Sequence, residues 1–277
     1  MGPDGGTPDF VLTLWTADPD LARRADQAGV DRVGLDLEIL GKHARQHEAL
    51  GTWITKHTCD QLPAIRGALT HASLFARTNP LHAGLGREVD QLLDAGVSVL
   101  MFPNFLDVSE LKAFLRMVGG RAKVVPLLER LAAAKQIERI VALGEIDEIH
   151  VGMNDLALDL GLKNRMEVLV SPTLAHISSI VGGAAKRLGV GGVARACDAN
   201  LPVPSDLVYA QYPRLGATAA LISRSFLPQK LSAAEFAAHI DGLRTRMRYW
   251  FTRSPEEIES SSRELEAHLA RGTGGLI

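Results

Sequence analysis

Cysteine, blocks of basic residues and long apolar runs are scarce in this chain of 277 residues. The two cysteines, Cys59 and Cys197, cannot form a disulfide framework, which favours a reducing compartment. Acidic and basic residues are interspersed and the formal net charge is −2, so we expect no nucleic-acid partner. No stretch approaches the roughly 20 apolar residues of a membrane span, and MGPDGGTPDF has no basic start before an apolar run. We therefore expect a soluble, cytoplasmic protein with no membrane partner.

The signatures of an open nucleotide-binding sheet and of a repeat protein are also absent. The first apolar run, FVLTLWTADPD, lacks the Gly-rich turn with which a doubly wound sheet binds phosphate. No internal repeat is visible. The chain does contain 46% hydrophobic and 22% charged residues, which is enough for one large core of the size found in α/β barrels.

Short apolar runs alternate with longer amphipathic segments, a pattern typical of a parallel sheet built from βα units. Eight such runs predict a closed (β/α)8 TIM barrel. The predicted strands are Phe10–Leu14, Arg32–Asp36, Ser73–Arg77, Ser98–Phe102, Lys123–Leu128, Glu148–Gly152, Gly189–Val193 and Ala219–Ser223. The segment LSAAEFAAHIDGLRTRMRYW is predicted to form the last barrel helix, and SPEEIESSSRELEAHLA to form one helix more.

Polar residues at the ends of these strands are the candidates for chemistry, because active sites of such barrels gather on the carboxyl-terminal face. They are Asp36, Glu38, Arg77, Asn104, Glu129, Asn154, Asp155 and Arg195. Two carboxylates at neighbouring strand ends, with an arginine across the barrel mouth, could hold a hard cation and an anionic substrate together. The oxygen-only pair Glu129 and Asp155 suits Mg²⁺ or Mn²⁺, or Co²⁺, rather than structural zinc.

Each of these residues also has a structural interpretation. Glu129 and Asp155 could be acids that stabilise helix N-termini, and Arg77 could form a surface salt bridge. Asp36 and Glu38 lie on the same side of a strand. They could order Arg77 or metal-bound water, or they could be hydrogen-bond anchors.

Three histidines allow similar alternatives. His57 closes the long unassigned segment 37–57 and is either a catalytic base or a surface or capping residue. His43, in the same segment beside basic residues, could belong to a solvated turn or to an anion clamp. His150 falls inside a predicted strand and is expected to pack there.

Five segments in chain order resemble the HpcH/HpaI aldolase family, which includes the citrate lyase β-type lyases. They are DRVGLDLEILGKHARQ, SLFARTNP, VVPLLER, VGMNDLALDLG and LGATAALISRSF. Each motif alone is common, but five in order on alternating βα units are fairly specific. The resemblance extends from the first predicted strand to Phe226.

The resemblance implies a metal site and a substrate site. It assigns Glu129 and Asp155 as metal ligands and Arg77 as the residue that binds the carboxylate of a 2-oxo acid such as pyruvate. Gly152 and Asn154, in the same segment as Asp155, become candidate substrate-binding residues. The divalent metal would act as a Lewis acid that stabilises the enolate of pyruvate.

The sequence departs from the family pattern at two positions. Better-known members have histidine directly after the Asp-x-Glu of the second strand, as catalytic base, but here Ile39 follows Glu38. The base could instead be His57, His43 or metal-bound water, with Asp36 and Glu38 as further catalytic candidates beside Arg77. The second departure is Arg130, where the family often has threonine. Its charge could bind a second acid group or could face outward.

These observations predict a class II aldolase, a metal-dependent carbon–carbon lyase. The expected reaction is retro-aldol cleavage of a 4-hydroxy-2-oxo acid, or the reverse addition of pyruvate to an aldehyde. One alternative is a lyase for malyl- or citryl-type acyl-CoA thioesters, although no extended basic groove for CoA phosphates is evident. Another is a catalytically impaired barrel that binds an oxo acid or sugar acid, which the missing histidine favours.

The chain is predicted to divide into a catalytic barrel, residues 1–250, and a C-terminal helical extension, residues 251–277. The extension is surplus to the barrel and could be exchanged between subunits, as family members lend a terminal helix to a neighbour. We therefore expect a homo-oligomer, either dimer, trimer or hexamer.

Overall fold

The computed structural model describes residues 8–41, 57–226 and 231–272. Its strands form a closed barrel in sequence order, and every neighbouring pair is parallel. This confirms the predicted fold, and each strand boundary lies within two residues of its prediction. The strands are β1 (Val11–Trp15), β2 (Arg32–Asp36), β3 (Ser73–Arg77), β4 (Val99–Phe102), β5 (Lys123–Leu128), β6 (Glu148–Val151), β7 (Arg187–Val193) and β8 (Ala217–Ile222).

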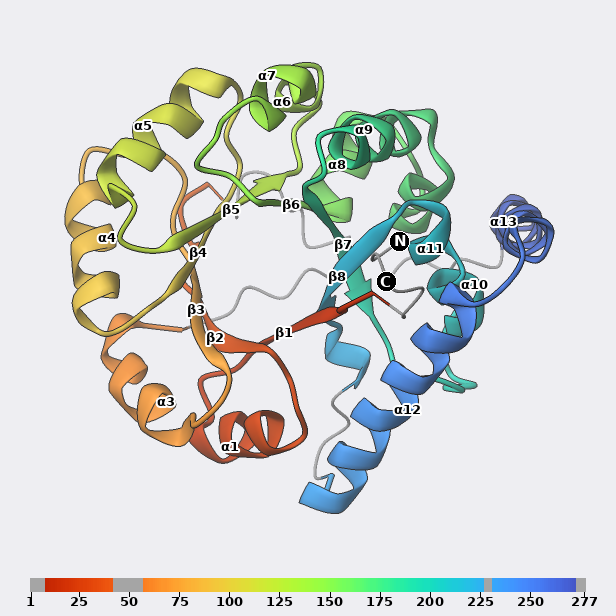
Figure 1. Cartoon of the computed structure of the whole chain (residues 1–277), viewed down its shortest axis with the longest axis horizontal. Helices are drawn as coiled ribbons and strands as arrows, with labels where there is room; N and C mark the ends of the chain where they lie inside the picture. Colours follow the sequence, from red (N-terminus) through yellow and green to blue (C-terminus); the bar gives the residue numbers. More distant parts are fainter. Residues whose placement is uncertain (1–7, 42–56, 227–230, 273–277) are drawn as a thin grey trace.

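Helices surround the barrel and cover its outer side (Figure 1). The connections from β1 to β5 carry α1 (Pro19–Gln27), η2 (Cys59–Gln61), α3 (Leu62–Ala68), α4 (Leu85–Asp94) and α5 (Val108–Val118). The next connections carry α6 (Leu131–Ala134), α7 (Ile137–Val141), α8 (Met153–Asp159), η3 (Arg165–Val170), α9 (Pro172–Gly183), α10 (Ser205–Tyr209) and α11 (Gln211–Arg214). After β8 follow η4 (Arg224–Phe226), α12 (Ala233–Phe251) and α13 (Pro255–Ala270).

The ends of the helices follow from local sequence. Asp107 begins α5 because its side chain accepts hydrogen bonds from the N–H groups of Ser109 and Glu110. The same helix ends at Gly119, whose φ of 60° is left-handed and therefore favours glycine. Reciprocal side-chain caps also begin α12 and α13, in which a serine is followed three residues later by glutamate.

Side chains alternate along the strands, and this alternation positions the site. Phe75, Val99, Met101, Val125 and Leu127 form an apolar cluster separate from the larger core between strands and helices. Because side chains two residues apart share a face, the next inward positions on β3 and beyond β5 carry an arginine and a glutamate, at 77 and 129. Apolar side chains thus fill the middle of the barrel interior, and charged side chains follow them at the carboxyl ends of the strands.

The C-terminal helix α13 packs on its own barrel, against α10, α11 and η3. Leu265 is fully buried, and Ser261 and Ser262 are buried beside it. His268 adds a hydrogen bond between its Nε2 atom and the carbonyl oxygen of Pro202, at 2.8 Å. The existence of this helix is therefore confirmed, whereas its exchange between subunits stays a prediction. None of the described helices combines the length and apolar character that crossing a membrane requires.

Candidate active site

A cavity of about 420 Å³ opens at the carboxyl end of the barrel. Its wall combines apolar side chains with ionisable ones, as small-molecule sites commonly do. The predicted site residues that line it are Glu38, Arg77, Glu129, Gly152, Asn154 and Asp155. Strand-end positions from β2, β3, β5 and β6 are therefore brought together in one place, as the sequence predicted.

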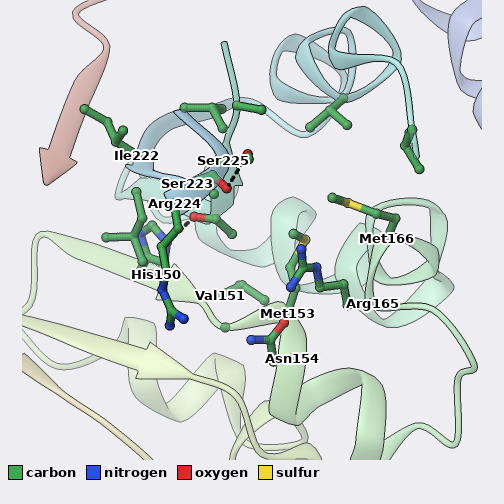
Figure 2. A pocket seen from close by; sticks show the side chains of 18 of the residues that line it. His150, Val151, Met153, Asn154, Arg165, Met166, Ile222, Ser223, Arg224 and Ser225 are labelled. Atoms are coloured by element: carbon green, nitrogen blue, oxygen red, sulfur yellow. Dashed lines mark hydrogen bonds between the residues drawn. The ribbon is translucent and has the colours of Figure 1, made fainter. Parts of the chain in front are cut away.

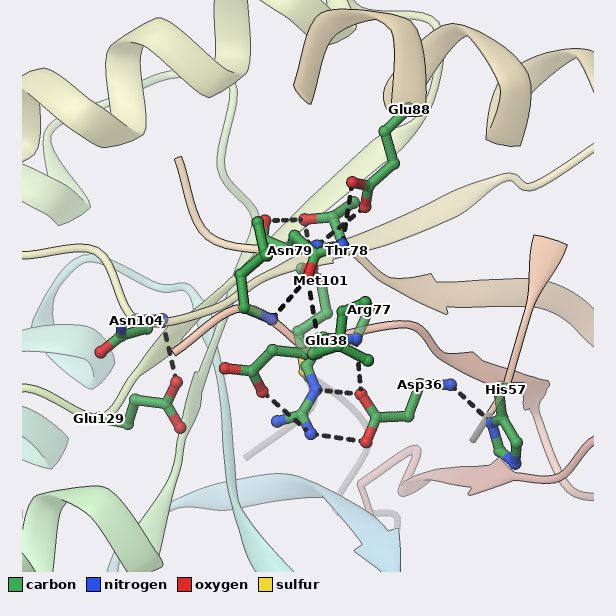
Figure 3. Close-up of polar contacts among 12 residues, drawn as sticks. Asp36, Glu38, His57, Arg77, Thr78, Asn79, Glu88, Met101, Asn104 and Glu129 are labelled. Carbon is green, nitrogen blue, oxygen red and sulfur yellow. Dashed lines mark hydrogen bonds and ion pairs between the residues drawn. The ribbon is translucent and has the colours of Figure 1, made fainter. Parts of the chain in front are cut away.

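Arg77 is buried in a network of two carboxylates (Figure 3). Its Nε atom donates to Oδ1 of Asp36 at 2.7 Å, and its Nη2 atom donates to Oδ2 of Asp36 at 2.8 Å. The Nη2 atom also lies 3.2 Å from Oε2 of Glu38. The pairing follows from strand register, since Asp36 and Arg77 are direct neighbours across β2 and β3.

The surroundings of Arg77 stabilise its protonated, positively charged form. Burial alone would lower the pKa of this guanidinium, but the charges of Asp36 and Glu38 raise the pKa above its ordinary value. The guanidinium also stacks over the ring of Trp15, at 4.4 Å from the ring centroid. The fork expected to face a substrate carboxylate is thus directed at Asp36. Among the described residues, Nη1 takes no hydrogen bond, and this edge remains for a ligand.

His57 is not among the residues that line the cavity. Its Nδ1 atom accepts a hydrogen bond from the backbone N–H of Asp36 at 3.0 Å, so a neutral ring carries its proton on Nε2. Asp36 is likewise absent from the cavity wall. Of the four predicted catalytic residues, Arg77 and Glu38 therefore line the cavity, whereas Asp36 and His57 support them from outside. His43 lies outside the described residues.

Glu129 and Asp155 are both buried, with 6% and 4% of their surface exposed. The backbone N–H of Asn104 donates to Oε1 of Glu129 at 2.9 Å. A Cβ atom at Gly152 would lie 2.7 Å from Oε2 of Glu129, so the missing side chain at position 152 leaves room for that carboxylate. Gly152 lines the cavity, and its role in substrate binding stays a prediction.

The residues present fit a divalent cation bound by few protein groups. Within the described ranges, no three histidine, cysteine, aspartate or glutamate side chains form a cluster that could hold a metal. Two buried carboxylates in one cavity wall, one beside a glycine cradle, instead match an open site for a hard cation. Such a cation would complete its coordination with water and substrate oxygens.

Arg130 faces away from the cavity. Its Nε atom donates to Oδ2 of Asp159 at 2.9 Å, and its Nη1 atom donates to Oδ1 of Asn104 at 3.1 Å. Asn104 has a positive φ of 51°, a conformation that asparagine tolerates better than most residues. Arg130 therefore contacts the residue whose N–H binds Glu129. Of the two alternatives for Arg130, the structure shows the outward one.

His150 is packed inside the barrel, as predicted. It is 2% exposed, and its Nε2 atom lies 3.2 Å from the carbonyl oxygen of Gly191. Burial lowers the pKa of His150 to about 4, against a smaller opposing effect of the Glu148 charge. The ring is therefore neutral near pH 7 and donates to Gly191.

The cavity residues that were not singled out from the sequence include Trp15, Arg165 and Arg224 (Figure 2 shows the two arginines). Trp15 and Arg224 were within reach of the same strand-end logic, since Trp15 ends β1 and Arg224 follows β8 by two residues. Arg165 carries no such signal, because it begins η3, well after β6. Its place in the cavity depends on how η3 folds back over the barrel mouth.

Comparison with known proteins identifies the family of the chain. The family model for HpcH/HpaI aldolase/citrate lyase matches residues 10–200, which is more than half of the chain. No curated protein matches the chain in sequence.

Solved structures resemble the fold at low sequence identity. An HpcH/HpaI aldolase from Desulfitobacterium hafniense DCB-2 is 18% identical, with 86% of this chain and 92% of that chain covered and a TM-score of 0.58. An HpcH/HpaI aldolase/citrate lyase family protein from Burkholderia cenocepacia J2315 is 19% identical, with coverage of 86% and 94% and a TM-score of 0.57. A citrate lyase from Burkholderia xenovorans LB400 is 14% identical, with coverage of 97% and 84% and a TM-score of 0.63.

Proposed function

The chain belongs to the HpcH/HpaI aldolase/citrate lyase family, and we propose that it is a divalent-metal-dependent carbon–carbon lyase acting on a 2-oxo acid. The observation that carries the proposal is the convergence of Glu129, Asp155, Gly152 and Arg77 on one cavity. A buried carboxylate pair and a buried guanidinium in one small space suit a substrate that is both anionic and bound through oxygen.

Glu129 and Asp155 would hold the cation, which we propose to be Mg²⁺, Mn²⁺ or Co²⁺. When bound, the metal would supply Lewis-acid polarisation of the 2-oxo group and so make the adjacent C–H more acidic. Asn104 fixes one oxygen of Glu129 through its backbone N–H, and Gly152 makes room for the other. These contacts preorient the carboxylate before any ligand arrives.

Arg77 binds the carboxylate of the 2-oxo acid through the edge at Nη1, while Asp36 and Glu38 hold the rest of its guanidinium. Glu38 is the residue we propose as proton acceptor, since its carboxylate lines the cavity and is 2% exposed. In the cleavage direction it takes the proton of the 4-hydroxyl group. The C3–C4 bond then breaks, the aldehyde leaves, and C3 of pyruvate receives a proton.

A second candidate function is an impaired barrel that binds an oxo acid without turning it over. The observation that favours it is the position of His57, which is hydrogen-bonded to the Asp36 backbone and lies outside the cavity wall. A binding protein, however, has little need for a buried carboxylate pair beside the ligand. Its prediction is binding of pyruvate without proton exchange.

The test is exchange of the methyl protons of pyruvate with deuterated water, followed by NMR. The exchange needs no aldehyde, so it isolates the step shared by aldolases of this type. We expect exchange with Mg²⁺, Mn²⁺ or Co²⁺, loss of exchange after exhaustive chelation, and loss in Asp155→Asn. Recovery of exchange when metal is added back to the chelated wild type is the control for damage. Metal-independent exchange, or metal binding without any exchange, would contradict the proposal.

We further propose a cytoplasmic homo-oligomer with an aldehyde as its second substrate. The support for an oligomer is the resemblance to family members that lend a terminal helix to a neighbouring subunit. Light scattering at micromolar concentration tests it, and a strictly monomeric protein would contradict it.

A further inference from the structure

Glu38 lies two residues beyond the end of β2, where the strand ladder no longer fixes the backbone. The last bond of this kind joins the backbone N–H of Leu37 to the carbonyl oxygen of Arg77, at 3.0 Å. The N–H of Glu38 itself donates to Oδ1 of Asp36 at 3.3 Å, which is long for a hydrogen bond. The position of the Glu38 carboxylate is therefore sensitive to how the residues after it are held.

Asn79 holds the backbone immediately after Glu38. Its Oδ1 atom accepts hydrogen bonds from the backbone N–H groups of Ile39, at 2.9 Å, and of Leu40, at 3.0 Å. Ile39 and Leu40 are 53% and 41% exposed, so their side chains contribute little packing to hold this segment. Two hydrogen bonds to one amide oxygen thus fix the direction in which the chain leaves Glu38.

Glu88, in the first turn of α4, fixes the orientation of the Asn79 amide (Figure 3). Its Oε1 atom accepts from the backbone N–H of Asn79 at 2.8 Å, and its Oε2 atom accepts from Nδ2 of Asn79 at 3.0 Å. Because Nδ2 faces a carboxylate, Oδ1 is the atom that faces Ile39 and Leu40. His82 adds a contact between its Nε2 atom and Oε2 of Glu88, at 3.2 Å.

This network lies beside the cavity, because Asn79 and Glu88 are not among the residues that line it, whereas Glu38 is. The network joins α4 to the segments that follow β3 and β2. Thr78 anchors it from below, since this residue is fully buried and its N–H donates to the carbonyl oxygen of Met101 at 3.1 Å. Asn79 can therefore influence the reaction only through the residues that it holds.

We propose that Asn79 is a positioning residue for Glu38. It holds the backbone after Glu38 in the orientation in which the carboxylate reaches both the cavity and the guanidinium of Arg77. The inference rests on the proposed function, in which Glu38 is the proton acceptor. Without the amide, the carboxylate is free to leave its reacting position, and misplacement of a reacting group by about 1 Å can lower a rate by about 10²-fold.

The test is Asn79→Ala, with kcat and KM measured separately for exchange of the methyl protons of pyruvate with deuterated water. We expect kcat to fall by about 10- to 100-fold. The KM for pyruvate should change little, because Arg77 keeps both hydrogen bonds to Asp36. Affinity for Mn²⁺, measured by titration calorimetry, should also change little, because the proposed metal ligands are untouched.

Asp107→Ala is the matched control. Asp107 also follows a strand, and one of its side-chain oxygens accepts from two backbone N–H groups, those of Ser109 and Glu110, at 2.7 and 3.0 Å. It begins α5 and does not line the cavity. Its kcat for exchange should equal that of wild type. Thermal unfolding of both variants shows whether each is folded.

An exchange of groups between Asn79 and Glu88 tests the same contact without removing a side chain. Glu88→Gln places one amide against another, so kcat should fall as in Asn79→Ala. Adding Asn79→Asp to this variant restores an acceptor opposite the new amide and keeps an oxygen for the N–H groups of Ile39 and Leu40. The double variant should therefore recover most of the lost kcat. His82 loses its acceptor in both proteins, so the comparison between them isolates the contact of residue 79 with residue 88.

An unchanged kcat in Asn79→Ala would overturn the inference, and so would an equal loss of kcat in Asp107→Ala. A loss of Mn²⁺ affinity or a rise in KM as large as the fall in kcat would assign Asn79 a general structural role instead. If Asn79→Ala does not fold, the comparison of Glu88→Gln with the double variant decides, and a double variant without recovery would overturn the inference. In each of these cases, metal-dependent exchange by wild type leaves the proposed function standing. Absence of that exchange in wild type would remove the proposed function and the inference together.

Discussion

Two largely buried arginine–carboxylate pairs lie at opposite ends of the barrel. At the amino end, Arg32 begins β2 and Glu148 begins β6, and they form two hydrogen bonds of 2.8 and 2.6 Å. At the carboxyl end, Arg77 and Asp36 close β3 and β2 with two hydrogen bonds of 2.7 and 2.8 Å. The distances in the two pairs are nearly the same, although Arg32 donates through Nη1 and Nη2 and Arg77 donates through Nε and Nη2.

Their surroundings differ, and the difference indicates their roles. Arg32 and Glu148 form a one-to-one pair outside the wall of the described cavity. Arg77 faces two carboxylates, stacks on an indole ring and contributes to that wall. A balanced pair at the amino end of a barrel serves stability, whereas an unbalanced cluster at the carboxyl end can also serve chemistry.

The largest effect should come from the carboxyl end, at Glu38. Glu38→Gln keeps the size of the side chain but removes the proposed proton acceptor, so pyruvate exchange should fall by about 10²- to 10⁴-fold. His57→Ala removes an acceptor for the Asp36 N–H. Exchange should fall by at most about 10-fold, because one hydrogen bond contributes a net of about 0.5–1.5 kcal/mol. NMR-monitored exchange rates measure both. A loss in His57→Ala as large as that in Glu38→Gln would instead identify His57 as the base.

The amino-end pair should show the opposite behaviour. Glu148→Gln breaks a buried pair from one side and leaves Arg32 without its counter-charge, which should lower the free energy of unfolding by about 3–5 kcal/mol. The exchange rate per folded molecule should change little, since Glu148 does not line the cavity. Urea unfolding and exchange on the same preparation measure the two quantities. If Glu148→Gln kept its stability but lost pyruvate exchange, the amino-end pair would serve catalysis rather than stability, contrary to this prediction.

A smaller effect is expected behind the carboxyl end, at Arg130. Arg130→Gln removes an ion pair to Asp159 and the hydrogen bond that holds Asn104, whose N–H binds Glu129. Affinity for Mn²⁺ should fall by about 10- to 100-fold, as for other residues that orient a metal ligand. Titration calorimetry measures it without turnover, with Arg116→Gln as the exposed control. Unchanged affinity would mean that Asn104 holds Glu129 without help.

The fold was largely predictable because barrel strands are short, apolar and evenly interrupted, so each boundary was found within two residues. The same strand-end logic identified Glu38, Arg77, Glu129 and Asp155 as cavity residues. It could not show that Asp36 occupies the fork of Arg77, because that pairing depends on the register between β2 and β3.

Arg165 marks the other limit of sequence reasoning. Local patterning predicts α8 and the residues that follow it, but it does not predict the direction in which η3 turns. That direction is set by packing of η3 against α8, α9 and α13, which are distributed over more than a hundred residues of the chain. The sequence pattern around such a residue therefore does not predict that it lines the cavity.

The smallest effect concerns His150, which lies between the two ends and is influenced by both. Burial lowers the pKa of His150 to about 4, with Glu148 opposing the shift and Arg32 and Arg77 adding to it. The ordinary pKa, near 6.5, applies to the unfolded chain, which therefore binds more protons than the folded chain between pH 6.5 and 4. Stability should accordingly be full above pH 7 and fall as the pH is lowered through this window.

Between pH 7 and pH 5 this single group should lower the free energy of unfolding by about 2 kcal/mol. His150→Gln keeps a donor for the Gly191 carbonyl oxygen but does not titrate, so its loss over the same interval should be smaller by that amount. Urea unfolding of both proteins at pH 7, 6 and 5 measures the difference, and the shared carboxylates, including Glu148, cancel in it. If the unfolding free energies of the two proteins changed in parallel with pH, the ring of His150 would have the same pKa in the folded and the unfolded chain. In that case the negative charge of Glu148 would raise the pKa of His150 as much as burial lowers it. Glu148 would then interact with His150 as well as with Arg32.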